Sequence, residues 1–209
     1  MIKVYNTWKG IKWAPAKVLL PAYPYSLSAR ERAAREATFL LSELPTPELV
    51  AFGKNYVVRE YLEGEVVGPD ARAVASALKL AHSSCWALGD AKFDNFLVRE
   101  GKVYFIDGEQ AVRTCDPLKQ GVDLVEASLF LMLFRGCKEV EALLREYGGG
   151  GQLKAFLLPS SLLLLLPCVP RILSVLKELS PPCRRASKPS LLSCWRSISR
   201  RARTSSPSS

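Results

Sequence analysis

Residues 89–110, GDAKFDNFLVREGKVYFIDGEQ, combine three polar side chains with a predicted β-hairpin. Asp90 stands five residues before Asn95, alternating apolar residues then predict two short strands across a Glu-Gly turn, and Asp107 follows the second strand. Because a hairpin returns the chain to its starting point, it would hold these groups against one cavity. Carboxylate and amide oxygens are ligands that Mg²⁺ prefers, and a further carboxylate can orient and deprotonate a hydroxyl. The stretch therefore indicates phosphoryl transfer.

The rest of the chain predicts an α+β fold, with strands mostly early and helices mostly late. Residues 1–5 and two segments that join near Gly53 and Lys54 have the composition of strands, and residues 6–28, broken by three prolines, predict a loop with a short helical turn. Apolar periodicity, Ser28 as a cap and Pro45 as a stop predict further elements. These are helices at residues 28–44, 71–83 and 121–134, and a hairpin at residues 96–98 and 103–106.

The chain has 209 residues and a formal net charge of +9, and the excess charge lies at one end. Residues 1–150 contain 19 basic and 19 acidic residues, so this part is formally neutral. Residues 151–209 contain ten basic residues and only Glu178 on the acidic side. The length suits one medium domain, or one domain and a tail. We expect a folded domain over residues 1–150.

Residues 151–209 differ from the rest, with a Leu-rich run followed by a basic end rich in Ser, Arg and Pro. A membrane span needs about 20 mostly apolar residues, and Pro159, Pro167, Pro170 and Arg171 interrupt the run, so no membrane association is expected. We predict a disordered tail, or a sequence that does not belong to the fold, as a shifted reading frame would produce. Non-specific binding of nucleic acid by the basic end stays open.

The six cysteines are widely spaced and include no CxxC pair, which argues against a zinc or thioredoxin-like site. We expect reduced thiols in a cytoplasmic protein. The first residues do not combine a basic region, an apolar run and a small-residue cleavage site, so no secretory signal is expected.

Three motifs resemble atypical protein kinases. GDAKFDNFLV (residues 89–98) is similar to the catalytic loop of kinases in its HGDL…N form. IDGEQAV (residues 106–112) matches a pattern of RIO kinases, and GVDLVEASLFL (residues 121–131) resembles a helix of the kinase subunit of the KEOPS tRNA-modification complex. Both branches occur in archaea, and the choice between them stays open.

The resemblance covers about residues 1–147 and implies a two-lobed, protein-kinase-like fold. The N-lobe would span about residues 1–62 and the C-lobe about residues 63–150. The glycine-rich strand pair that covers the phosphates in kinases would precede Lys3 and is absent, and the helical C-lobe is truncated. Either translation begins upstream of Met1 or nucleotide is held weakly.

The resemblance assigns roles to the polar residues around the hairpin. Asp90 matches the catalytic aspartate, and Lys92 the lysine that contacts the transferred phosphate. Asn95 and Asp107 match the magnesium ligands. Asp123 resembles the buried aspartate that braces the catalytic loop.

Other residues match the nucleotide-binding positions. Lys3 corresponds to the lysine that contacts the phosphates, and Glu36 to its ion-pair partner on a helix. Glu60, Tyr61 and Leu62 lie in the predicted hinge, whose backbone would bind adenine. Simpler interpretations of the first two are a solvated lysine at a strand end and a glutamate paired on a solvated helix face.

Two further departures from the kinase pattern bear on the site. Leu88 and Gly89 replace the basic residue before the catalytic aspartate, and the triplet that begins at Asp107 reads Asp-Gly-Glu, without the usual phenylalanine. The only histidine, His82, is predicted to be a structural residue at a helix end.

The expected function is that of an ATP-dependent serine/threonine protein kinase that uses Mg²⁺, with Mn²⁺ as a substitute, on a protein substrate. One alternative is an ATPase switch in an RNA-linked assembly. The other is an inactive pseudokinase that serves as a scaffold for partners.

Overall fold

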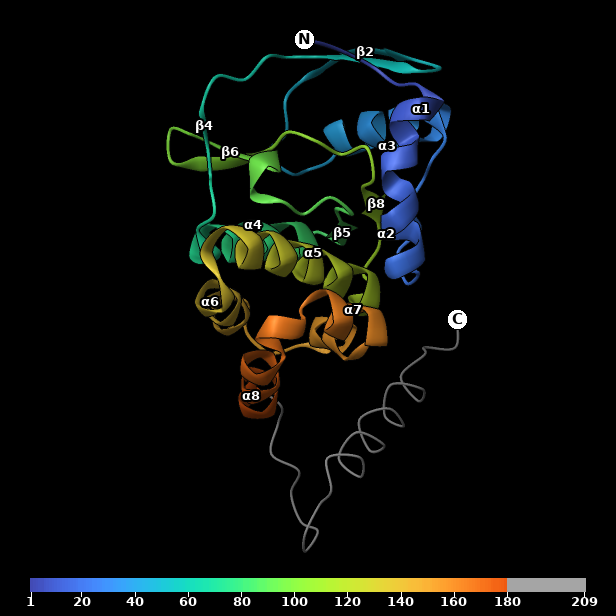
Figure 1. Ribbon diagram of the computed structural model, residues 1–209. Helices are drawn as coiled ribbons and strands as arrows, with labels where there is room; N and C mark the ends of the chain where they lie inside the picture. Colours follow the sequence, from blue (N-terminus) through green and yellow to red (C-terminus); the bar gives the residue numbers. More distant parts are fainter. Residues whose placement is uncertain (180–209) are drawn as a thin grey trace, which may run out of the picture. The chain divides into compact units, whose positions relative to one another are not determined.

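The N-terminal strands form a three-stranded antiparallel sheet in the order β1-β3-β2. Lys3 on the outer strand pairs with Val57 on the central strand, which also pairs with Phe52. This sheet belongs to a computed structural model that describes residues 1–179 (Figure 1). The strands are β1 (Ile2–Val4), β2 (Leu49–Gly53) and β3 (Tyr56–Arg59).

Helix α3 (Ala29–Leu40) covers the inner face of this sheet. The Ser28 side chain accepts a hydrogen bond from the Glu31 amide and so caps the first turn. Small and apolar residues on one side of the helix pack against the sheet, separately from the main core. This cluster consists of Tyr5, Ala33, Ala37, Leu40 and Val57.

The main core lies among the helices that Figure 1 shows below the strands. The Asp70 carboxylate caps α4, and the Asp116 carboxylate caps α5, whose first residue is Pro117. These helices are α4 (Ala71–Ser83), α5 (Pro117–Arg135) and α6 (Cys137–Tyr147).

Two small antiparallel sheets connect the strands to the helices. β6 and β7 form the predicted hairpin, in which Phe96 pairs with Phe105 and the turn residues Glu100 and Gly101 both have positive φ. The hairpin and the mixed α+β class are therefore confirmed. The first sheet contains β4 (Glu65–Val66), β6 (Phe96–Arg99) and β7 (Lys102–Phe105), and the second contains β5 (Trp86–Ala87) and β8 (Val112–Arg113).

The segment predicted as a loop is largely helical. The Asn6 side chain accepts a hydrogen bond from the Lys9 amide, which starts the first turn, and Pro15 lies in the first turn of α2, where a missing N–H costs nothing. The prolines therefore mark boundaries of short helices. The helices are α1 (Thr7–Gly10), η1 (Ile11–Trp13) and α2 (Ala14–Leu19).

The compact unit extends to Leu179, which differs from the predicted boundary at residue 150. Buried residues of this extension recur every three or four positions and pack into the main core, as a helix face requires. Two of its prolines lie in the first turn of a helix. The elements are η3 (Gly151–Leu157), α7 (Pro159–Leu164), η4 (Leu166–Cys168) and α8 (Val169–Leu179).

Charges and cysteines also attach this extension. Glu178 accepts a hydrogen bond from Arg145 at 2.6 Å, and Arg171 pairs with Glu141 at 2.8 Å. Disulfides join Cys137 to Cys168 and Cys85 to Cys115, so reduced thiols are not found at these four positions. The disorder predicted for residues 151–209 is therefore wrong over residues 151–179, which form helices. The remainder, with the basic end for which nucleic-acid binding was left open, lies outside the described residues.

Within residues 1–179, no helix is both long and apolar enough to cross a membrane.

A chain that ends at Leu179 should unfold cooperatively, whereas one that ends at Gly150 should not reach the native state. The shorter chain loses the buried side chains of Leu153, Phe156 and Ile172. Each contributes about 1.5–3 kcal/mol, in a domain whose total stability is about 5–15 kcal/mol. Thermal unfolding followed by circular dichroism measures this, and equal midpoints for the two chains would contradict the boundary at Leu179.

Candidate functional site

One ammonium group joins three distant parts of the chain. Lys3 Nζ on β1 lies 2.7 Å from Glu36 Oε2 on α3 and 2.9 Å from Asp107 Oδ1, which follows β7. Glu36 is completely buried, and it also accepts a hydrogen bond from the Tyr5 hydroxyl. The Lys3 and Asp107 side chains remain 24% and 23% exposed, so a ligand can reach both. The structure thus pairs Lys3 with Glu36, as the sequence predicted, and neither solvated alternative describes these two residues. Asp107, predicted only as a magnesium ligand, joins the same ion-pair system.

The charges in this group stabilise one another. Burial alone would lower the pKa of Lys3, but the carboxylates of Asp107 and Glu36 raise it above its ordinary value. Burial would raise the pKa of Asp107, but the Lys3 ammonium lowers it below the usual range. Lys3 and Asp107 are therefore both ionised at neutral pH, as a site for phosphate and a cation requires.

The predicted catalytic loop lies between β5 and the short helix η2 (Phe93–Asn95). Asn95 Nδ2 donates a hydrogen bond to the backbone oxygen of Asp90 at 2.8 Å. Within residues 1–179 no hydrogen bond to the Asn95 amide oxygen is found, so this oxygen can bind a cation. Lys92 Nζ lies 3.2 Å from Asp90 Oδ2. Burial raises the pKa of Asp90 above its ordinary value, although the Lys92 charge opposes this rise. A carboxylate with a raised pKa accepts a proton more readily.

Asp123 on α5 holds the residues before Asp90. Its carboxylate accepts hydrogen bonds from the Leu88 amide at 2.7 Å and from the Gly89 amide at 2.8 Å. His82, at the end of α4, lies with Nε2 3.0 Å from Asp123 Oδ2 and Nδ1 2.8 Å from the Tyr147 hydroxyl. The loop is therefore braced although no basic side chain precedes Asp90, and His82 lies in the structural position predicted for it.

Gly89 permits the sharp turn that presents Asp90. Its φ is +66°, and an added Cβ would overlap the Tyr23 ring. The Tyr23 hydroxyl donates to the backbone oxygens of Ala87 and Gln110, at 2.9 and 2.8 Å, so the ring that excludes a side chain also ties the loop to the segment after Asp107.

Glu109 anchors the segment that follows Asp107. Its carboxylate lies 2.9 Å from Arg32 Nη1 on α3 and 2.7 Å from Lys12 Nζ, and it accepts a hydrogen bond from Trp13 Nε1 at 3.1 Å. A Cβ on Gly108 would overlap the Phe39 ring, so the chain packs directly on α3 here. The Asp-Gly-Glu triplet, which lacks the phenylalanine of the kinase pattern, is thus held by the ion pairs of Glu109.

Gln110 adds a second anchor to the same segment. Its side-chain amide donates to the Ser26 backbone oxygen at 2.9 Å and accepts from the Ser26 amide at 2.8 Å. Two hydrogen bonds therefore join the segment before α3 to the segment after Asp107, in the way that paired bonds join neighbouring β-strands.

The predicted hinge follows β3. Leu62 is buried and Tyr61 is exposed, while Glu60 lies 3.8 Å from Arg99 across the surface. Among residues 1–179, the backbone groups of Tyr61 and Leu62 take part in no backbone hydrogen bond. They therefore keep a donor and an acceptor for a ligand such as adenine.

The donors for a cation are few. No group of three or more His, Cys, Asp or Glu side chains within the described part of the chain could hold a metal ion by itself. The Asn95 amide oxygen and the Asp107 carboxylate are hard oxygen donors, and Mg²⁺ commonly binds one or two protein ligands together with phosphate oxygens and water. The donor set therefore fits magnesium that arrives with a nucleotide.

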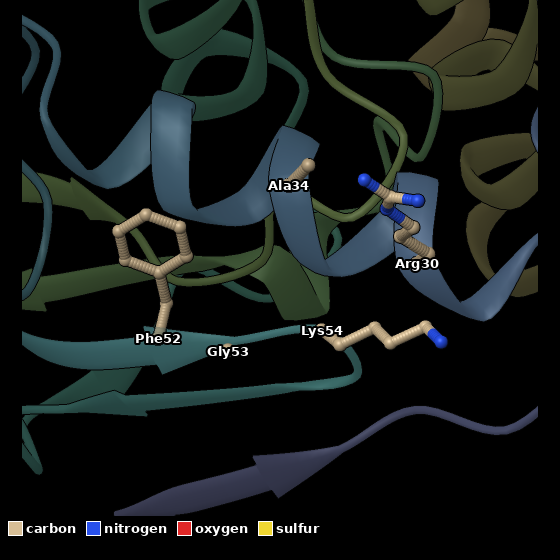
Figure 2. A pocket seen from close by; sticks show the side chains of 5 residues that line it. All are labelled: Arg30, Ala34, Phe52, Gly53 and Lys54. Carbon is tan, nitrogen blue, oxygen red and sulfur yellow. The ribbon is translucent and has the colours of Figure 1, made fainter.

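A surface depression of about 570 Å³ lies elsewhere, between α3 and the β2-β3 turn (Figure 2). It shares no residue with the predicted site. Its lining consists of Arg30, Ala34, Phe52, Gly53 and Lys54.

Some residues of the site had no role assigned from the sequence. Glu109 and Gln110 lay in a motif without an individual role, and Glu126 lay in a predicted helix in which only Asp123 had been assigned one. Each makes its contacts with residues from the segment predicted as a loop or from α3. For Glu126 alone the sequence offered a signal, a charged residue at a core position of a helix.

Replacing Gly89 by alanine should destabilise the protein more than the same change at Gly68, a matched control. Both have positive φ, but an added Cβ at Gly68 meets nothing within 4 Å. Strain should cost about 1 kcal/mol at each position, and overlap with Tyr23 should add about 1–3 kcal/mol at Gly89 only. Chemical denaturation of the two variants measures the difference, and equal losses would show that Tyr23 does not confine the loop.

No protein-family model matches this chain, and a search of curated proteins also found no match. What the site does is therefore inferred from its own geometry and chemistry.

Proposed function

We propose that the chain has a two-lobed, protein-kinase-like fold and transfers the terminal phosphoryl group of ATP to a serine or threonine hydroxyl of a protein. The observation that carries this proposal is the position of Lys3 between Glu36 and Asp107. An ammonium held by a buried glutamate next to a cation-binding aspartate is suited to place nucleotide phosphates. The separate small cluster under the N-terminal sheet supports a division into two lobes.

Different residues would bind different parts of the nucleotide during phosphoryl transfer. The backbone of Tyr61 and Leu62 would hold adenine, and Lys3 would hold phosphate oxygens. Asn95 and Asp107 would hold Mg²⁺, which would neutralise charge on the phosphates.

Asp90 would orient the acceptor hydroxyl. As the hydroxyl oxygen bonds to the terminal phosphorus, the bond between that phosphorus and the oxygen that links it to ADP breaks, and ADP leaves with this oxygen. The hydroxyl proton would pass to Asp90. Lys92, next to Asp90, would stabilise the negative charge on the transferred group. We place the protein in the cytoplasm, where ATP and protein substrates meet, either of the RIO type or in an RNA-linked assembly of the KEOPS type. The disulfides Cys85–Cys115 and Cys137–Cys168, which are rare in that compartment, argue against this placement.

Two aspartate variants should separate binding from chemistry. Asp107→Asn removes a negative ligand, so Mg²⁺-dependent binding of ATP should weaken and transfer should fall with it. Asp90→Asn keeps the cation ligands but removes the base, so ATP should bind as before while transfer drops by about 100-fold or more. Asp94→Asn, in the same loop but exposed, is the matched control and should change neither quantity.

Calorimetry gives ATP binding, and labelled phosphate gives transfer to the chain itself or to a generic basic protein, with Mg²⁺ and then Mn²⁺. Full transfer by Asp90→Asn would refute its role as the base. ATP binding by the wild type without transfer would favour the scaffold, and phosphate release to water alone would favour the ATPase switch.

A further inference from the structure

Glu126 is a buried acid that the proposed reaction does not use. It lies on α5 one turn after Asp123, and its Oε2 accepts a hydrogen bond from the Ala91 amide at 3.1 Å. Its Oε1 accepts a hydrogen bond from the Tyr25 hydroxyl. Because Ala91 directly follows Asp90, the two carboxylates of α5 hold the loop on both sides of the proposed base.

The surroundings of Glu126 disfavour the ionised form of its side chain. Within residues 1–179 it forms no ion pair, and the acids Asp123 and Asp90 lie nearby. Burial, reinforced by these two charges, raises the pKa of Glu126 to about 8, although the hydrogen bonds from Tyr25 and Ala91 oppose the rise. An apolar side chain at such a position is often as stable or more stable. Stability therefore does not explain the acid.

The other partner of Glu126 comes from the segment that leads into α3. Tyr25 is buried and stacks on Trp13, with ring centroids 5.9 Å apart. The neighbouring Ser26 is joined to Gln110, and α3 begins three residues later with Glu36 on its inner side. Glu126 is thus a second point, besides the contact of Tyr23 with Ala87 and Gly89, where this segment reaches the loop of Asp90.

We propose that Glu126 is a positioning residue for Asp90, which it acts on through the Ala91 amide, and that Tyr25 fixes Glu126 in turn. The position of the base then depends on the segment of residues 20–28 that also positions α3 and its Glu36. This proposal rests on the proposed function, because it treats Asp90 as the base. Glu126 would then fix the position of the part of the site that binds the hydroxyl relative to the part that binds the nucleotide.

The test compares three variants of the full chain. Glu126→Leu removes both acceptor oxygens and should lower kcat at least tenfold with the KM for ATP unchanged, since Lys3 and the hinge are untouched. Tyr25→Phe should lower kcat in the same way but less. Glu126→Gln should restore most of the activity, because the Gln amide oxygen can still accept the hydrogen bond from the Ala91 amide. Val175→Ala, buried in α8, is a stability control that should leave kcat unchanged.

A wild-type kcat in Glu126→Leu, or a fall that Gln does not rescue, would overturn the positioning role. Exchange of the Ala91 amide hydrogen, followed by NMR, tests the contact without any turnover and should be at least tenfold faster in Glu126→Leu. If the wild type transfers no phosphate, the proposed function fails. The exchange rate then decides the contact by itself, and an unchanged rate overturns the proposal.

Discussion

The arrangement of the site depends on the charge of Lys3. Glu36 is fully buried, and a buried carboxylate costs several kcal/mol unless a cation and hydrogen bonds compensate it. Lys3 supplies the nearest cation, Arg59 Nε lies 3.6 Å from Glu36 Oε1, and the Tyr5 hydroxyl supplies a hydrogen bond. Because Lys3 also contacts Asp107, the burial of Glu36 fixes where β1, α3 and the segment after β7 meet. The need to compensate the buried charge of Glu36 thus constrains the relative positions of β1, α3 and the segment after β7.

Buried carboxylates also hold the loop of Asp90, by accepting hydrogen bonds from it. There the partners are mainly backbone amides: Asp123 holds those of Leu88 and Gly89, and Glu126 holds that of Ala91. Aromatic residues of the segment before α3 connect the two systems, since the Tyr23 hydroxyl bonds to the backbone on both sides. The loop is accordingly held on both sides of Asp90 and does not need a basic residue before it.

Local features of the fold could be predicted from the sequence, and contacts across long separations could only partly be. The hairpin and the helix at residues 71–83 follow from periodicity, and the pairing of Lys3 with Glu36 followed from the resemblance to a known motif, whereas the contact of Lys3 with Asp107 was not predicted. The role of Glu109 was not predictable, because its partner Arg32 lies 77 residues away and no local pattern joins them. The helices of residues 151–179 were missed since their prolines were taken as interruptions, whereas they start helices.

The affinity for Mg·ATP of the Lys3→Met variant, measured by calorimetry on the full chain, tests the central claim most directly. Methionine keeps the length of the side chain but removes the charge that holds phosphate and compensates Glu36. The wild type should bind Mg·ATP, and the variant should bind it at least tenfold more weakly. Lys9→Met, on the exposed side of α1, should match the wild type. Equal affinities of the Lys3→Met variant and the wild type, or no binding by the wild type, would contradict the account.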